Sequence, residues 1–239
     1  MNHRAADSLR PTSIDAFPGG APGSVVITAG QTRVLCTASI QEDVPRWIKR
    51  DPETGQPVHG WVSAEYAMLP GSTPQRKKRG SDGRGTEIQR LIGRVLRAAV
   101  DMDAMPGLAV TCDCDVLVAD GGTRTAAITG AYVALRQALT WAVEQGRLDR
   151  LESAMPFDRQ VAAVSVGIID GTPTLDLDYP LDVRAEVDMN VAMTAAGKFI
   201  EVQGTGEKGS FDRAELDQLL DLATAGIRQL MDIQRAAMG

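Results

Sequence analysis

The stretch DCDVLVADGGTRTAAITG, Asp113 to Gly130, changes its pattern at the centre. Polar and apolar residues alternate up to Ala119, which is typical of a β-strand with one buried face. After the threonine and arginine that follow the glycine pair, small and apolar residues continue at helical spacing. The stretch therefore predicts a strand over 108–119 that ends in a glycine turn and leads directly into a helix over 123–143.

This turn contains the parts of a phosphate-binding site. Gly121 and Gly122 lack a Cβ atom, so their backbone can approach a ligand closely. The first N–H groups of a helix attract an anion, Thr123 adds a hydroxyl donor, and Arg124 adds a guanidinium that binds phosphate through two hydrogen bonds. An ordinary strand-to-helix turn, with Thr123 as the cap and Arg124 on the surface, explains the same residues. The residues alone leave both interpretations open.

The rest of the chain mixes strand and helix patterns in an order typical of an α+β or mixed α/β sheet domain. The segments 172–179 and 183–193 are predicted to be the two arms of one hairpin. Asp212 and Glu215 have the spacing of a capping box, so the last helix is predicted to begin near Asp212. The other predicted strands are 25–28, 32–39, 61–69, 160–169 and 198–203, and another helix is predicted from Ile88 to Ala99.

Length and composition fit one globular domain. The chain has 239 residues, of which 44% are hydrophobic and 4% aromatic, so we predict a single domain over 1–239 with a weak seam near 147–158. The polar start resembles no secretory signal, and no run approaches the ~18 apolar residues that span a bilayer. Three cysteines suit free thiols in a reducing compartment. We therefore expect a cytoplasmic protein without a membrane segment.

Positive charge is concentrated in one segment of this acidic chain. The net charge is -6, yet residues 76–97 carry +6 and leave -12 for the rest. A local basic segment favours a phosphate-rich partner, because such ligands bind through positive patches. A solvated basic helix face explains the same run of charge. The basic residues of this segment are Arg76, Lys77, Lys78, Arg79, Arg84, Arg90, Arg94 and Arg97.

A second group of residues is acidic. Alternation along 172–179 places Asp176 and Asp178 on one side of the first hairpin arm, and Pro180 turns the chain so that Asp182 returns to that side. Carboxylates that converge in this way can hold Mg²⁺ together with phosphate oxygens, or one of them can act as a general acid. A hairpin with a solvated acidic face explains the same alternation.

Two other patterns do not complete a site. GTGEKG, residues 204–209, matches the dinucleotide-binding fingerprint, but the last helix leaves no room for the returning strand of that unit. Cys112 and Cys114 alternate with aspartate on an apolar strand face, which favours small core residues over zinc ligands.

Taken together, the segments resemble the ribonuclease PH family, the phosphate-dependent 3′ exoribonucleases that trim transfer RNA precursors. The resemblance covers nearly the whole chain, including SLRP, GSVVITAGQTRVLCTASI, GWVSAEYAMLPGST, GRGTEIQRLIGRVLRAAVD, DCDVLVADGGTRTAAITGA, VDMNVAMT and IEVQGTGE. It implies the ribosomal-S5-domain-2-like fold, with mixed β-sheets packed with α-helices, and a ring-shaped homohexamer. It also implies that inorganic phosphate attacks the 3′ end of an RNA and releases a nucleoside diphosphate.

The resemblance implies phosphate and RNA contacts at particular positions. Phosphate would be bound by Arg84 and by the sequence Gly122, Thr123 and Arg124. Single-stranded 3′ tails of tRNA precursors and other RNA would be guided by the basic loop. The residues expected to contact RNA in that loop are Arg76 and Arg79.

The resemblance also implies roles for three carboxylates. Asp176 and Asp182 would be catalytic, one as a Mg²⁺ ligand and the other as the acid that protonates the departing 3′ oxygen, and Asp188 would lie nearby as a further metal ligand. A non-catalytic RNA-binding ring subunit of the same fold is the alternative. The presence of Arg84 and Arg124 together with the carboxylates argues against it, because a scaffold needs no phosphate site.

Overall fold

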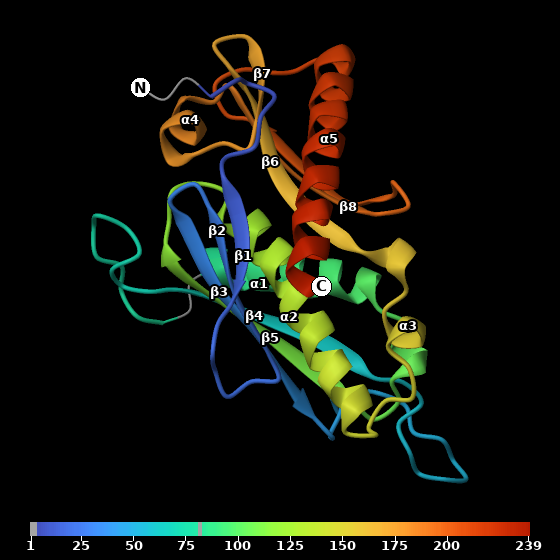
Figure 1. The fold of residues 1–239 in the computed structure, drawn as a ribbon. Helices are drawn as coiled ribbons and strands as arrows, with labels where there is room; N and C mark the ends of the chain where they lie inside the picture. Colours follow the sequence, from blue (N-terminus) through green and yellow to red (C-terminus); the bar gives the residue numbers. More distant parts are fainter. Residues whose placement is uncertain (1–3, 81–82) are drawn as a thin grey trace.

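A computed structural model describes residues 4–80 and 83–239 of the chain. Within these residues the strands form two β-sheets, and the long helices pack against the sheets and between them (Figure 1). The strand and helix patterns predicted from the sequence are present apart from the hairpin described below. No helix in the described part of the chain is long and apolar enough to cross a membrane.

The first sheet has five strands in the order β1-β2-β3-β5-β4. All neighbours are antiparallel except β4 and β5, which run parallel because helix α1 (Gly83–Ala99) connects them across the sheet. Their side chains alternate between a buried face under the helices and a more open face. The strands are β1 (Thr12–Ala16), β2 (Gly23–Ala29), β3 (Thr32–Gln41), β4 (Trp61–Met68) and β5 (Ala109–Val118).

The second sheet has four antiparallel strands in the order β7-β6-β8-β9. Helix α5 (Arg213–Met238), red in Figure 1, runs along this sheet and buries Leu219, Ile227 and Leu230. It begins with the predicted capping box between Asp212 and Glu215. The strands are β6 (Val161–Ile169), β7 (Thr172–Leu175), β8 (Val187–Thr194) and β9 (Phe199–Gly206).

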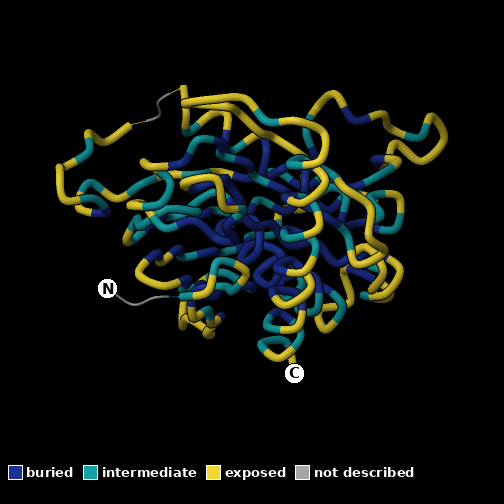
Figure 2. Tube along the Cα trace, turned by 90° about the horizontal axis from the view of Figure 1, so that it is seen from above, coloured by how far each residue is buried: buried dark blue, intermediate teal, exposed yellow. Residues whose placement is uncertain are grey.

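Helix α2 (Thr123–Glu144) joins the two sheets. It contacts β2 and β3 of the first sheet and β6 of the second, so residues around most of its circumference are buried. This explains its nearly uniform apolar sequence, since a helix enclosed on all sides needs no polar face. Figure 2 shows the resulting buried centre, with exposed residues confined to the loops and outer faces. The beginning of α2 is thereby fixed against both sheets.

The predicted hairpin between 172–179 and 183–193 is wrong. Strand β6 lies between β7 and β8 and pairs with both of them, so the two arms are not neighbours. The segment between them forms a short helix α4 (Tyr179–Arg184), capped by the Asp178 carboxylate on the N–H of Leu181. The proline that was expected to turn the chain lies in the first turn of α4, where a missing N–H costs nothing.

Short helices complete the described chain. The segment near the predicted seam contains α3 (Leu151–Ala154) and a 3-10 turn at Phe157–Arg159, and a further 3-10 turn lies at Met102–Ala104. The stretch with α3 and Phe157–Arg159 leads from α2 to β6 and so connects the two sheets.

Candidate active site

The glycine turn between β5 and α2 has the conformation that its sequence requires. Gly121 and Gly122 both have positive φ, 74° and 62°, which residues with a Cβ atom rarely adopt. A Cβ atom on Gly121 would lie 2.6 Å from the carbonyl carbon of Asp178. The Thr32 hydroxyl donates to the Gly121 carbonyl at 2.7 Å and accepts from the Asp120 N–H at 2.9 Å. The turn is therefore shaped by close backbone packing as well as by its hydrogen bonds.

The start of α2 presents donors to solvent. Gly122 is the N-cap and has no side chain to cap the helix, so the first N–H groups lack intrahelical partners. The Thr123 hydroxyl is 2.8 Å from the Tyr66 hydroxyl of β4. Arg124 donates to the Gln203 side chain of β9 at 2.6 Å, which holds its guanidinium in one direction. These contacts orient both side chains.

A cavity of about 620 Å³ opens beside this turn. Its walls come from both sheets, from α1 and α4, and from the basic loop that follows β4. A volume of this size accommodates a nucleotide-sized ligand. The predicted site residues that line it are Arg76, Arg84, Gly122, Thr123, Arg124, Asp182 and Asp188.

Two carboxylates face two arginines in this cavity. Burial, together with the negative charge of Asp182, raises the pKa of the Asp188 carboxyl to about 6. Burial likewise raises the pKa of Asp182, with a further contribution from the negative charge of Glu207. Arg84 and Arg124 lower both pKa values without overcoming these effects. The cavity therefore brings together uncompensated carboxylates and fixed positive charges.

Asp176 does not belong to this group, contrary to the expectation that it would join Asp182 and Asp188. It has a φ of 56°, which ends β7 and removes its side chain from the predicted alternation. Its carboxylate is buried and bound by the Arg10 guanidinium through both oxygens, at 2.7 Å and 3.0 Å. It is absent from the residues that line the cavity.

The residues of the basic segment divide into two sets. Arg76 lines the cavity, whereas Arg79 is exposed and does not. On α1, Arg94 binds Glu201, and Arg97 lies over the Trp61 ring at 4.8 Å and donates to a backbone carbonyl. Arg76 and Arg84 of this segment thus line the candidate site, whereas Arg94 and Arg97 have structural partners.

Some residues of the site were not predicted. Lys77 lines the cavity and belonged to the basic run, so its charge was visible in the sequence. Gln203, Glu87 and Tyr66 orient the turn from distant elements, and no local pattern marked them. The Arg10–Asp176 pair joins residues 166 positions apart and has no signature in spacing.

The Asp182–Asp188 pair is more typical of an open site for a hard divalent cation than of a closed site made only of protein ligands. Among the residues described, no three His, Cys, Asp or Glu side chains are grouped so that they can hold a metal ion. Of the three carboxylates expected at the metal site, Asp182 and Asp188 line the cavity and Asp176 does not. Mg²⁺ is commonly bound by one or two carboxylates plus substrate phosphates, so this pair beside an anion site suits it.

The family of the chain is defined by two adjoining sequence models. The model described as 3′ exoribonuclease family, domain 1, matches residues 8–139, and that described as domain 2 of the same family matches residues 159–226. Together they cover most of the 239 residues. The chain belongs to the 3′ exoribonuclease family.

Curated relatives agree with this assignment over nearly the full length. A ribonuclease PH of Corynebacterium efficiens is 53% identical over 242 residues, covering 99% of this chain and 95% of the relative. A ribonuclease PH of Synechococcus sp. is 52% identical over 241 residues, covering 99% and 96%. One from Mycolicibacterium smegmatis is 51% identical over 241 residues, covering 98% and 90%.

Solved structures share the fold at low sequence identity. Rice (Oryza sativa) Rrp46 superposes with a TM-score of 0.76 at 16% identity, over 99% of this chain and 98% of that one. A structure described as the Archaeoglobus fulgidus exosome with RNA bound to the active site gives a TM-score of 0.77 at 19% identity, over 97% and 91%. The two-sheet architecture is therefore that of the RNase PH fold.

Proposed function

We propose that this protein is a phosphorolytic 3′-to-5′ exoribonuclease, a nucleotidyltransferase that shortens the 3′ ends of tRNA precursors. Relatives of about half identical sequence over the full length, all of them ribonuclease PH, support this activity. One observation of this chain carries the proposal. Arg84, Arg124 and the glycine turn line one cavity with Asp182 and Asp188, so groups that suit an anion lie near groups that suit a cation.

The arrangement supports transfer of the terminal nucleotidyl group to inorganic phosphate through positioning and charge. Arg84, Arg124 and the first N–H groups of α2 bind inorganic phosphate and hold one of its oxygens toward the last phosphodiester of the RNA. The same cations offset the negative charge that develops on phosphorus during the attack. Thr123 donates its hydroxyl to the same anion while Tyr66 fixes its direction.

The reaction needs no nucleophile from the protein, because inorganic phosphate is the nucleophile. An oxygen of hydrogen phosphate forms a bond to the terminal phosphorus, and the bond from phosphorus to the 3′ oxygen of the preceding nucleotide breaks. The proton of hydrogen phosphate passes to that 3′ oxygen. The products are a nucleoside diphosphate and an RNA that is one nucleotide shorter.

We assign Asp182 and Asp188 to Mg²⁺, and Asp176 to a structural role. Held by these two carboxylates, Mg²⁺ would supply positive charge that offsets the negative charge developing in the reaction. Arg10 binds both oxygens of the Asp176 carboxylate in a buried pair, which disfavours its use as a metal ligand or an acid. In this assignment the two open carboxylates take the metal role, and the transfer needs no aspartate as acid.

The RNA partner, the assembly and the location of the protein are proposed on separate grounds. Arg76 at the cavity and Arg79 beyond it would guide a single-stranded 3′ tail, because phosphates bind to exposed cations of this kind. A homohexameric ring is proposed from the family likeness. A cytoplasmic location is proposed because all three cysteines are free and buried, as suits a reducing compartment.

A non-catalytic RNA-binding ring subunit remains the competing function. The direct test incubates a 3′-tailed RNA with the protein and Mg²⁺, with and without inorganic phosphate, and separates the products by chromatography. Nucleoside diphosphates that appear only with phosphate are expected. Nucleoside monophosphates regardless of phosphate would identify a hydrolytic nuclease, and binding without release would identify the scaffold.

A further inference from the structure

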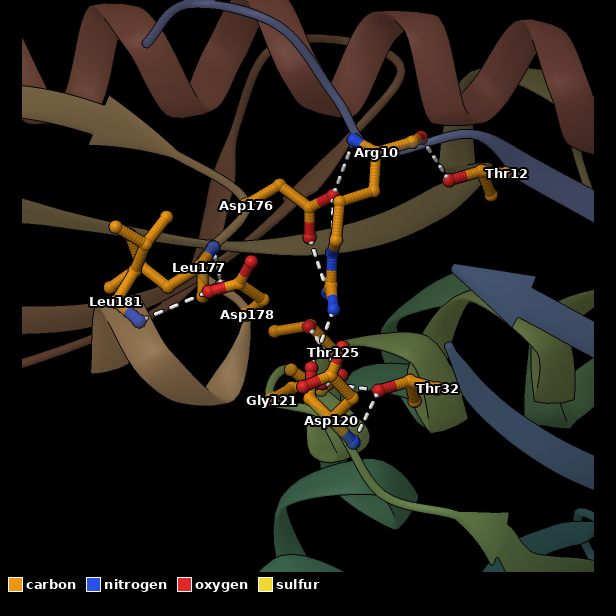
Figure 3. A network of polar contacts seen from close by, with 12 residues as sticks. Arg10, Thr12, Thr32, Asp120, Gly121, Thr125, Asp176, Leu177, Asp178 and Leu181 are labelled. Carbon is orange, nitrogen blue, oxygen red and sulfur yellow. Dashed lines mark hydrogen bonds and ion pairs between the residues drawn. The ribbon is translucent and has the colours of Figure 1, made fainter. Parts of the chain in front are cut away.

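Arg10 links two segments that lead into the candidate site (Figure 3). Its backbone N–H donates to Asp176 Oδ2 at 2.8 Å, its Nε donates to the same oxygen at 3.0 Å, and its Nη2 donates to Oδ1 at 2.7 Å. Its remaining terminal nitrogen, Nη1, donates to the Asp120 carbonyl at 2.7 Å. One guanidinium thus binds the segment after β7 and the turn before α2.

These two segments carry opposite parts of the site. Asp120 directly precedes the glycine turn that begins α2, and Asp176 directly precedes the segment that leads into α4 and Asp182. The segments also touch through backbone, because a Cβ atom on Gly121 would lie 2.6 Å from the Leu177 carbonyl oxygen. The relative position of anion site and cation site is therefore set at this contact.

The surroundings of Asp176 fix it in one conformation. Its N–H donates to the Ser165 carbonyl at 2.7 Å, and the following N–H of Leu177 donates to the Ser165 hydroxyl at 3.0 Å. Arg4 donates to the Asp176 carbonyl at 2.8 Å. Arg10 and Asp176 expose only 6% and 7% of their side chains. A buried ion pair gains little net stability over packed apolar residues, so its fixed geometry is the more telling property.

We propose that the Arg10–Asp176 pair is a positioning clamp that sets the distance between the phosphate-binding turn and the Asp182–Asp188 pair. Neither residue touches the substrate in this role. The proposal rests on the proposed phosphorolysis and deepens it, since it assigns a function to the carboxylate that the sequence placed among the catalytic residues.

The clamp is tested by a double-mutant cycle of Arg10→Gln, Asp176→Asn and the combined variant. Turnover at saturating RNA and phosphate is expected to fall roughly 10²-fold in each single variant, because a displacement of about 1 Å in a reacting group has that effect. The KM for RNA is expected to change less than about twofold, since the basic loop is intact. The combined variant should be no slower than the slower single variant, because one interaction is lost only once.

A catalytic or metal-binding Asp176 gives a different pattern. Asp176→Asn and the combined variant would then be inactive, while Arg10→Gln would keep near-normal turnover because the carboxylate is still present. That result overturns the clamp. Wild-type turnover in Arg10→Gln and in Asp176→Asn would overturn it as well.

Two further variants separate positioning from general stability. Gln234 is fully buried and donates to the Thr129 and Val161 carbonyls away from the cavity, so Gln234→Ala should lower the melting temperature without changing turnover of the folded protein. If turnover falls as much in Gln234→Ala as in Arg10→Gln, the effect is only structural. Arg10→Lys is the second variant, for use if Arg10→Gln folds poorly. It keeps the positive charge with fewer hydrogen-bond donors, so its turnover is expected to lie between those of wild type and Arg10→Gln. If wild type releases no nucleoside diphosphate, the proposed function fails rather than the clamp.

Discussion

The molecule brings arginine and aspartate together at two neighbouring places with opposite results. Arg10 and Asp176 form a buried pair in which both carboxylate oxygens are bound. In the cavity, Asp182 and Asp188 keep raised pKa values, because burial and repulsion from neighbouring carboxylates outweigh the attraction of the nearby arginines. The first place is closed and fixes structure, whereas the second is open and leaves charge available for ligands.

The difference between the two places shows that residue type alone does not decide the role of an aspartate. All three aspartates lie within a stretch of 13 residues, and each has an arginine close by or within electrostatic range. Burial and the number of satisfied hydrogen bonds distinguish them. The predictions below test this distinction, beginning with the largest expected effect.

Removing Arg124 should damage the open site most. Arg124→Ala is expected to lower turnover by roughly 10² or more and to raise the phosphate concentration for half-maximal rate, because a preorganised cation at the anion site is lost. Phosphate titrations of the steady-state rate measure both effects. Arg94→Ala is the matched control, since Arg94 binds Glu201 outside the cavity lining. Near-normal phosphate kinetics in Arg124→Ala would exclude the anion site.

Asp188→Asn should weaken the cation site while leaving the fold intact. We expect turnover to fall by about tenfold or more and the Mg²⁺ requirement to rise, because one of two carboxylate ligands is lost. Titration with Mg²⁺ measures this change, and a chelator should abolish activity in the wild type. Asp170→Asn is the control, because Asp170 pairs with exposed Arg184 away from the cavity lining. An unchanged Mg²⁺ requirement in Asp188→Asn would remove the metal role.

Gly121→Ala should disturb the contact between the glycine turn of the open cavity and the segment that follows the closed Arg10–Asp176 pair. The added Cβ atom would meet backbone at 2.6 Å at a φ of 74°, so we expect a loss of about 1–3 kcal/mol in unfolding free energy and about tenfold in turnover. Gly171→Ala has a similar φ of 73° but open space around the Cβ position, so it reports strain alone. Equal turnover in the two variants would show that the close packing has no functional effect.

Neutralising the basic loop should have the smallest effect. Arg76→Gln with Arg79→Gln is expected to weaken RNA binding several-fold and to lower the slope of log affinity against log salt by about 1.4, as two single-strand phosphate contacts are lost. Binding isotherms at several salt concentrations measure the slope. Arg213→Gln with Arg228→Gln on exposed positions of α5 is the control. An unchanged slope would place the RNA elsewhere.

Local patterns were sufficient to predict much of the fold and seven of the residues that line the cavity. The strand, glycine turn and helix around Gly121 follow from residues next to each other, so their geometry was readable. The alternation along 172–179 predicted the wrong face for Asp176 because that residue leaves the strand at a positive φ. The hairpin failed for a related reason, since the choice of β6 as the partner of both β7 and β8 depends on non-local packing.

The unpredicted residues share long sequence separation. Arg10 contacts Asp176 across 166 positions, and Arg124 contacts Gln203 across 79. Neither separation repeats or matches a motif, so only the folded arrangement identifies the pairs. The local pattern does not predict the short helix α4, because proline suits both a loop turn and the first turn of a helix.

A crystal structure of the protein grown with inorganic phosphate and Mn²⁺ in place of Mg²⁺ would test the open and closed assignments most directly. We expect phosphate against Arg84, Arg124 and the glycine turn, and an anomalous Mn²⁺ peak between Asp182 and Asp188. Asp176 should remain bound to Arg10. An anomalous peak at Asp176, with Arg10 displaced from its carboxylate, would contradict the account.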